Sequence, residues 1–174
     1  LQSWFIRQMD DFITRKGRRL IGWDEILEGG LAPGASVMSW RGMEGGIAAA
    51  RARHDVVMAP TAWTYFDYCQ GDPATEPLNI GNSLPLSKAY EFEPIPVGLS
   101  AEESKHIMGG QCQLWTEYMP TNREVEYMAF PRLCATAEAV WSQSQRRSYD
   151  DFVDRLQTHV QRLDELEVNY RPLD

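Results

Sequence analysis

The chain contains 174 residues, of which 43% are hydrophobic and 24% are charged. This composition is typical of one packed globular domain and excludes a disordered chain. Lysine and arginine number 17 against 25 aspartates and glutamates, a net charge of −8, which argues against nucleic-acid binding because such proteins normally present a basic face. No apolar run approaches the roughly 20 residues that a membrane-spanning helix needs.

The cysteines and histidines are scattered along the chain. They are Cys69, Cys112 and Cys134, and His54, His106 and His159. An odd number of widely spaced cysteines does not form a disulfide framework, so these residues are interpreted as small buried hydrophobic side chains. No two histidines have the spacing that places them on one face of an element, and no CxxC pair occurs. We therefore expect neither a metal nor a cofactor.

Helical and strand-like patterns alternate in the first third of the chain. Residues 1–15 have apolar residues at helical spacing, which predicts a helix with one buried stripe. The stripe consists of Trp4, Phe5, Met9, Phe12 and Ile13. Short apolar stretches predict three strands, at residues 19–23, 36–40 and 55–59. Between the last two strands, the alanine-rich residues 45–53 predict a helix.

Residues 61–96 are the irregular part of the chain. They contain five prolines together with scattered aromatic residues. A segment this long with little regularity is usually functional or disordered, and its aromatic content argues for order.

The remaining chain predicts one strand and three helices. Ser100 with Glu103 forms a capping-box pattern for a short helix. A fourth strand is expected within residues 106–116, ending at Leu114 and Trp115. Residues 122–142 predict a long helix that Pro131 kinks or divides.

The last predicted helix spans residues 149–167, with Ser148 as its N-cap. Its inward residues are Phe152, Leu156, Val160 and Leu163. Alternating strands and helices indicate an α/β fold, in which helices cover a parallel sheet. No GxGxxG follows the first strand and no GxxxxGK[ST] occurs, which removes the common nucleotide-binding folds.

An aromatic residue stands at or shortly after the end of every predicted strand, with a carboxylate or an arginine close by. These aromatic residues are Trp23, Trp40, Trp63 and Trp115. In parallel α/β proteins, ligands gather at the carboxyl ends of the strands. An aromatic face packs against the C–H face of a sugar ring, and carboxylates bond to the sugar hydroxyls. The pattern therefore predicts a shared sugar-binding pocket.

Four motifs at these strand ends also carry a family resemblance. They are Gly22-Trp23-Asp24-Glu25-Ile26-Leu27, Val37-Met38-Ser39-Trp40-Arg41-Gly42, Tyr65-Phe66-Asp67-Tyr68 and Leu114-Trp115-Thr116-Glu117. In this order they resemble the second half of the catalytic barrel of the family 20 glycoside hydrolases, the β-N-acetylhexosaminidases, over about residues 4–141. The resemblance implies a partial (β/α)8 TIM barrel of about four parallel strands. Residues 1–174 would be the C-terminal part of a single catalytic (β/α)8 domain.

The resemblance also implies a reaction and a substrate. The family hydrolyses terminal, non-reducing β-linked N-acetylglucosamine or N-acetylgalactosamine, so the expected ligand is an amino-sugar glycoside or oligosaccharide. In the family mechanism the acetamido oxygen of the substrate attacks the anomeric carbon, and an Asp-Glu pair orients the acetamido group and supplies the general acid.

Roles for individual residues follow from the matched motifs. Trp23, Trp40 and Trp115 would wall the pocket for the acetamido methyl group. Tyr65 would donate its hydroxyl to the acetamido oxygen and so take part in catalysis. Asp67 and Glu117 would bond the outer sugar hydroxyls. The family often has a further Trp in the loop before the last strand, and this chain has none between Trp63 and Trp115.

The family's catalytic His-x-Gly-x-Asp-Glu motif is absent from these residues. Asp24-Glu25 follows Trp23 and lacks the upstream histidine, so it is expected to start a helix or make structural hydrogen bonds. Asp164-Glu165 lies in the last predicted helix, where a solvated face is expected. We therefore expect the catalytic pair upstream of this chain, and the chain alone to be inactive. Family members are commonly periplasmic, secreted or lysosomal, and the residues do not identify the compartment.

Two other interpretations remain open at this point. One is a carbohydrate-binding α/β module without catalytic function. The other is an unrelated α/β enzyme that uses Asp67 and Glu117 as its acid–base pair. Four strands cannot close a barrel, so self-association through open sheet edges is also expected.

Overall fold

The computed structural model describes residues 1–173, which divide into two compact units. The first comprises Leu1–Thr61 and Pro94–Gln111, and the second comprises Ala62–Glu93 and the chain from Cys112 onward. The first unit holds the sheet, and the second consists of helices and connecting segments.

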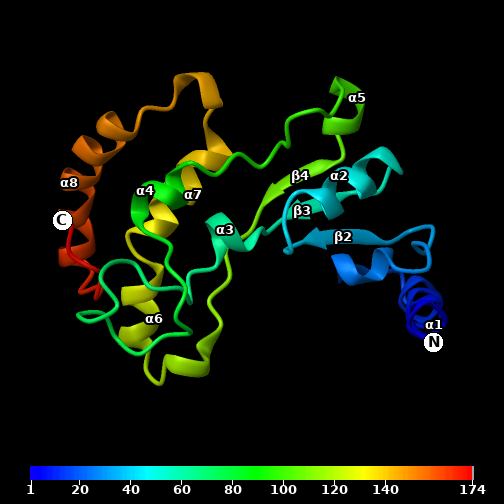
Figure 1. The fold of residues 1–174 in the computed structure, drawn as a ribbon, viewed down its shortest axis with the longest axis horizontal. Helices are drawn as coiled ribbons and strands as arrows, with labels where there is room; N and C mark the ends of the chain where they lie inside the picture. Colours follow the sequence, from blue (N-terminus) through cyan, green and yellow to red (C-terminus); the bar gives the residue numbers. More distant parts are fainter. Residues whose placement is uncertain (174) are drawn as a thin grey trace. The chain divides into compact units, whose positions relative to one another are not determined.

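The sheet has four parallel strands in chain order. They are β1 (Ile21–Trp23), β2 (Ser36–Ser39), β3 (Val56–Met58) and β4 (Ile107–Gly110). Figure 1 shows β2, β3 and β4 side by side. Trp23 pairs with Met38, and Ser39 pairs with Met58. Parallel neighbours in sequence order confirm the α/β architecture expected from the alternating patterns.

Helices and fully buried apolar side chains support the sheet. Val37, Val56 and Met58 have no exposed surface. The helix α2 (Glu44–Arg51) connects β2 to β3 and packs on both strands, with the small residues Ala49 and Ala50 buried. The unit also contains α1 (Gln2–Arg15), the 3-10 helix η1 (Asp24–Leu27) and α5 (Ala101–Ser104).

The second unit is built around one apolar cluster. Its helical elements are α3 (Thr61–Thr64, beginning at the unit boundary), α4 (Leu86–Tyr90), η2 (Thr116–Tyr118), α6 (Asn122–Ala129), α7 (Arg132–Trp141), η3 (Ser144–Arg146) and α8 (Tyr149–Glu165). The cluster consists of Phe66, Leu84, Ala89, Tyr90, Ala135, Phe152 and Leu156. Helix α4 packs on α7 (Figure 1). No helix within residues 1–173 is long and apolar enough to cross a membrane.

Several local expectations are confirmed. Ser100 and Glu103 make both bonds of a capping box at α5. Pro131 separates α6 from α7. The Ser148 hydroxyl accepts a hydrogen bond from the Asp151 amide at the start of α8. The predicted inward residues of α8 are buried except Val160, which is half-buried. Cys69 is buried, whereas the other two cysteines are only half-buried, and all three are free thiols.

The predicted end of the fourth strand is wrong. Strand β4 stops at Gly110, before Leu114 and Trp115. The pairing with β3 shifts register between Val56 and Val57, and Gly109 has a φ of +139°, a conformation that side chains with a Cβ rarely adopt. The ladder resumes after the shift, with Val57 paired to Gly109 and Met58 to Gly110, where β3 also ends. Beyond Gly110 the Gln111 amide still donates to the Met58 carbonyl at 2.9 Å, and Gln113 forms an isolated bridge with Tyr65.

The prediction that the apolar stripe of the first helix is buried is also wrong for the residues that the structure describes. Helix α1 forms, but Trp4, Phe5 and Phe12 are 62%, 53% and 52% exposed, and Asp10 is its buried residue. The helix meets η1 and the loop after it through polar bonds, including Ser3 Oγ to the Glu28 carbonyl at 2.9 Å. Helical spacing gives the width of an apolar face but does not identify which element covers it.

Candidate functional site

Three of the expected site residues line one small pocket in the second unit, with a volume of about 10 Å³, which is room for about one water molecule. They are Asp67, Trp115 and Glu117. The remaining lining residues are Leu78, Asn79, Ile80, Tyr118, Met119 and Met128. The pocket thus combines carboxylates with aromatic and aliphatic side chains, the mixture expected of a sugar site.

Main-chain pairing brings the two carboxylate-bearing segments together. Tyr65 and Gln113 form a parallel bridge. The Phe66 amide donates to the Gln113 carbonyl, and the Gln113 amide donates to the Thr64 carbonyl, each at 2.8 Å. Asp67 follows the first of these paired segments, and Trp115 and Glu117 follow the second. The pairing therefore holds the three residues near one another.

Asp67 is a buried carboxylate with an unsatisfied oxygen. The residue is 6% exposed, and no residue that the structure describes donates a hydrogen bond to its Oδ1 atom. Burial raises the pKa of Asp67, and the charge of Glu117 raises it further, while a main-chain hydrogen bond and the charge of Arg132 oppose the shift. A buried acceptor without a donor is costly, so this oxygen is suited to accept a hydrogen bond from a bound hydroxyl group.

Arg132 organises the main chain around Asp67. Its side chain is fully buried, and its terminal nitrogens donate to four carbonyls. These belong to Phe66 (2.6 Å), Tyr68 (2.9 Å), Leu84 (3.0 Å) and Met128 (2.6 Å). The guanidinium carbon also lies 4.8 Å from the centroid of the Phe66 ring.

Sequence reasoning gave Arg132 no role. A signal was present, because α7 begins with this arginine and continues Leu133-Cys134-Ala135-Thr136-Ala137. A cationic residue at the start of a helix of mostly small, apolar residues indicates a buried charge that needs a structural partner.

Trp63 and Tyr65, the other expected aromatic residues of this unit, do not line the pocket. Tyr65 is 8% exposed, and its ring centroid lies 5.7 Å from that of Tyr68. Lys88 Nζ lies 5.2 Å from the centroid of the Trp63 ring. The pocket wall that sequence reasoning missed is the aliphatic pair Leu78 and Ile80.

Trp23 and Trp40 belong to the first unit, where they end β1 and follow β2. Trp40 Nε1 donates to both oxygens of Glu25, at 3.1 Å each. Asp24 is 2% exposed and accepts from the amides of Trp40 (3.1 Å) and Arg41 (3.2 Å), and from Arg41 Nε at 2.6 Å. The Asp24-Glu25 pair therefore begins η1 and makes the structural hydrogen bonds expected of it.

The other acidic pair is also accounted for. Asp164 is exposed on α8 and accepts a hydrogen bond from the Tyr170 hydroxyl at 3.0 Å. Within residues 1–173, no cluster of three or more histidine, cysteine or acidic side chains could hold a metal ion.

The family model described as "Glycosyl hydrolase family 20, catalytic domain" matches residues 1–144. A β-hexosaminidase of Porphyromonas gingivalis is 48% identical over 171 residues, which cover 98% of this chain and 22% of that protein. A β-N-acetylhexosaminidase of Cellulomonas fimi is 32% identical over 83% of this chain and 29% of its own length.

A solved structure agrees with these sequence relatives. It is a family 20 exo-β-N-acetylglucosaminidase of Vibrio harveyi in complex with N-acetylglucosamine, with a TM-score of 0.91 and 37% identity. The similarity covers 98% of this chain and 27% of the Vibrio chain. The agreement confirms the expected partial barrel of four parallel strands with helices. The chain spans between about a fifth and a third of the length of these proteins.

Proposed function

The chain belongs to glycosyl hydrolase family 20, and we propose that it supplies sugar-binding residues to a β-N-acetylhexosaminidase site. The substrate is a terminal, non-reducing β-linked N-acetylglucosamine or N-acetylgalactosamine. Residues 1–174 form the C-terminal part of one catalytic (β/α)8 domain, and the general acid belongs to the protein outside these residues. The absence of a His-x-Gly-x-Asp-Glu motif supports this division.

The observation that carries the proposal is the environment of Asp67. A carboxylate that is 6% exposed, with one oxygen lacking a donor among the described residues, lines a pocket with Glu117 and Trp115. A sugar hydroxyl donates to that oxygen and removes the penalty of the unpaired acceptor. Glu117, on the more exposed side, accepts from a second hydroxyl.

The acetamido group is bound by aromatic residues. Within the second unit, Trp115 packs on its methyl group and the Tyr65 hydroxyl donates to its oxygen. The part that the family resemblance implies for Trp23 and Trp40 at the same group stays a prediction. As the acetamido oxygen attacks the anomeric carbon, the glycosidic C–O bond breaks, and the aglycone oxygen leaves with a proton from the general acid outside these residues. Positive charge then spreads over the acetamido group as the oxazolinium ion forms. The hydrogen bond from Tyr65 holds the attacking oxygen in place, so its contribution is to orientation as well as to electrostatics.

The test is hydrolysis of a chromogenic aryl β-N-acetylglucosaminide by the full-length protein and its variants. Asp67→Asn keeps the size of the side chain and removes the charge that accepts a sugar hydroxyl. We expect kcat/KM to fall by about 10- to 100-fold, as for a lost hydrogen bond to a charged group. Asp154→Asn makes the same change at an exposed position of α8 and serves as the matched control.

Two results would contradict the proposal. Equal activity of Asp67→Asn and Asp154→Asn would remove Asp67 from the site. Sugar affinity without any hydrolysis by the full-length protein would favour a carbohydrate-binding module instead.

A further inference from the structure

We propose that Arg171, on the C-terminal segment (residues 168–173), is a positioning residue that holds the loop closing one side of the sugar pocket. The inference rests on the proposed function for the identity of the ligand. The loop comprises residues 72–80, here called the wall loop, and it contributes Leu78, Asn79 and Ile80 to the pocket of Asp67 and Glu117.

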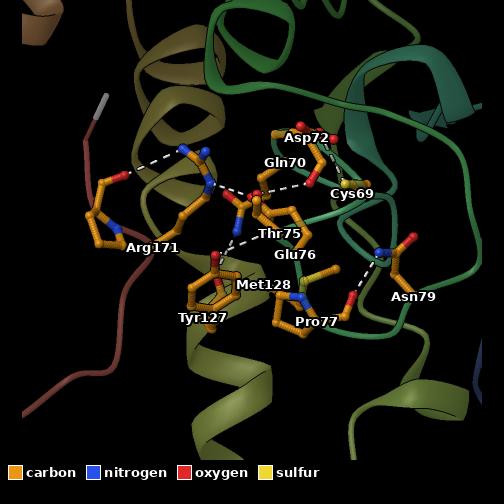
Figure 2. A network of polar contacts seen from close by, with 12 residues as sticks. Cys69, Gln70, Asp72, Thr75, Glu76, Pro77, Asn79, Tyr127, Met128 and Arg171 are labelled. Atoms are coloured by element: carbon orange, nitrogen blue, oxygen red, sulfur yellow. Dashed lines mark hydrogen bonds and ion pairs between the residues drawn. The ribbon is translucent and has the colours of Figure 1, made fainter.

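The link between segment and loop is a buried ion pair. Figure 2 shows Arg171 and Tyr127, from the C-terminal segment and α6, pointing toward the carboxylate of Glu76. Arg171 Nε lies 2.6 Å from Glu76 Oε1, and the Tyr127 hydroxyl donates to Glu76 Oε2 at 3.1 Å. The side chain of Glu76 is only 3% exposed. Both carboxylate oxygens are therefore fixed, each by a different element.

The wall loop connects the fixed carboxylate of Glu76 to the pocket residues. Only Pro77 separates Glu76 from Leu78. The Glu76 amide donates to the Asp72 carbonyl at 3.2 Å, and Asp72 Oδ1 accepts from the Ala74 amide at 3.0 Å.

The far end of the loop is ordered in the same way. Asn79 Nδ2 donates to the Pro77 carbonyl at 2.8 Å (Figure 2). Asn79 Oδ1 accepts from the Gly81 amide, also at 2.8 Å. Pro77, with its restricted φ, joins Glu76 directly to this turn, so the position of Glu76 constrains the positions of Leu78 and Ile80.

The C-terminal segment is itself anchored beside α6. The Arg171 amide donates to the Phe130 carbonyl at 3.1 Å. Asn169 bonds to Glu126 through its amide at 2.8 Å, and to the Arg123 carbonyl through Nδ2 at 2.8 Å. Leu173 packs against the apolar cluster of the unit. These contacts fix the position of Arg171 relative to α6, the helix that also contributes Met128 to the pocket.

The close packing around the pair makes its geometry specific. A Cβ atom on Gly71 would lie 2.8 Å from Glu76 Oε1 and would collide with the guanidinium of Arg171. A buried ion pair adds little net stability compared with an apolar contact, but it fixes direction through its hydrogen bonds. This is the property that a positioning contact needs.

The test uses the full-length protein with Arg171→Met, Arg171→Lys and Gly71→Ala. Arg155→Met is the matched control, because Arg155 pairs with Glu138 at 2.6 Å on α7 and α8 and is not part of the pocket. Two readouts are compared: KM and kcat for an aryl β-N-acetylglucosaminide, and hydrogen exchange of the amides of residues 78–81.

We expect Arg171→Met and Gly71→Ala to raise KM by about 3- to 10-fold with kcat nearly unchanged, the cost of one weakened binding contact. Exchange at residues 78–81 should accelerate in the same variants. Arg171→Lys keeps the charge and should recover part of both effects. Arg155→Met should change neither readout, even where it lowers the melting temperature.

Exchange at residues 78–81 that is no faster in Arg171→Met than in Arg155→Met would overturn the positioning role. An unchanged KM with faster exchange would also overturn it, because the loop would then move without affecting the pocket. Failure of the proposed function is separate: the wild-type protein would not hydrolyse the substrate, while the exchange measurement would still decide whether Arg171 holds the loop.

Discussion

Arg132 donates hydrogen bonds to the two main-chain carbonyls that flank Asp67, those of Phe66 and Tyr68. The buried cation therefore fixes the backbone on both sides of the carboxylate, and its positive charge also favours the ionised form of Asp67. One side chain thus supports both the geometry and the charge of the proposed sugar-binding group.

Arg132→Met should destabilise the protein strongly. The variant leaves four carbonyls without their donor, and each buried unsatisfied group costs about 1–3 kcal/mol, so a loss of about 3 kcal/mol or more is expected. Denaturant unfolding measures the change. Arg155→Met removes an exposed cation and should cost at most about 1 kcal/mol. Equal losses in the two variants would contradict this interpretation.

Asp67→Asn should raise stability at neutral pH while it lowers activity. The folded-state pKa of Asp67 lies above its unfolded value, so ionisation is harder in the folded protein. Between the two pKa values the folded state binds more protons, and the stability of the wild type falls as pH rises through this window. The advantage of Asn should therefore appear above the folded pKa and vanish below about pH 3.9, the unfolded value. Unfolding free energies measured across this range test the prediction, and a pH-independent difference would refute it.

Asp24→Ala should destabilise the first unit. The change removes the acceptor of the Trp40 and Arg41 amides and of the Arg41 side chain. Loss of a buried acceptor shared by these donors is expected to cost about 2–4 kcal/mol. The melting temperature should fall more than in Glu28→Ala, which removes only a longer, exposed contact of Arg41. Similar melting temperatures for both variants would argue against a structural role of Asp24.

Tyr90 should make stability depend on pH in the alkaline range. Burial raises the pKa of Tyr90 to about 12, helped by its hydrogen bond to Glu138. The unfolded phenol ionises near pH 10 while the folded one stays protonated. This contribution to stability is therefore complete below pH 10 and is lost as pH rises toward 12. Tyr90→Phe should flatten part of this decline, and absorbance titration of the phenolate should lose its latest step.

Much of the fold follows from local sequence patterns. Short apolar stretches alternating with helical ones identify the parallel strands, and Ser100 with Glu103 identifies a helix start, because each pattern acts over a few residues. The end of β4 at Gly110 coincides with the end of its partner β3 at Met58, which is a property of the pairing and not of either strand. The exposed apolar face of α1 likewise could not be predicted, because helical spacing does not show which element packs against that face.

The candidate site was predictable only in part. Strand-end aromatics and acids predicted Asp67, Trp115 and Glu117, and these three residues line one pocket. Arg132 and Arg171 could not be placed in the same way. Arg171 pairs with Glu76, 95 positions away, and Arg132 bonds to the main-chain carbonyl of Phe66, 66 positions away. Motif similarity identifies groups that touch a ligand, whereas supporting contacts depend on the packed structure.

The central claim is that this chain binds the sugar while the general acid lies outside it. The most direct measurement is the pH–rate profile of the full-length protein with Glu25→Gln, using an aryl β-N-acetylglucosaminide and Glu165→Gln as control. Glutamine preserves an acceptor for the Trp40 indole, so kcat should stay within about tenfold of the wild type and the profile should keep its shape. A fall in kcat of about 10²- to 10⁴-fold with loss of the alkaline limb would make Glu25 the general acid and contradict the claim.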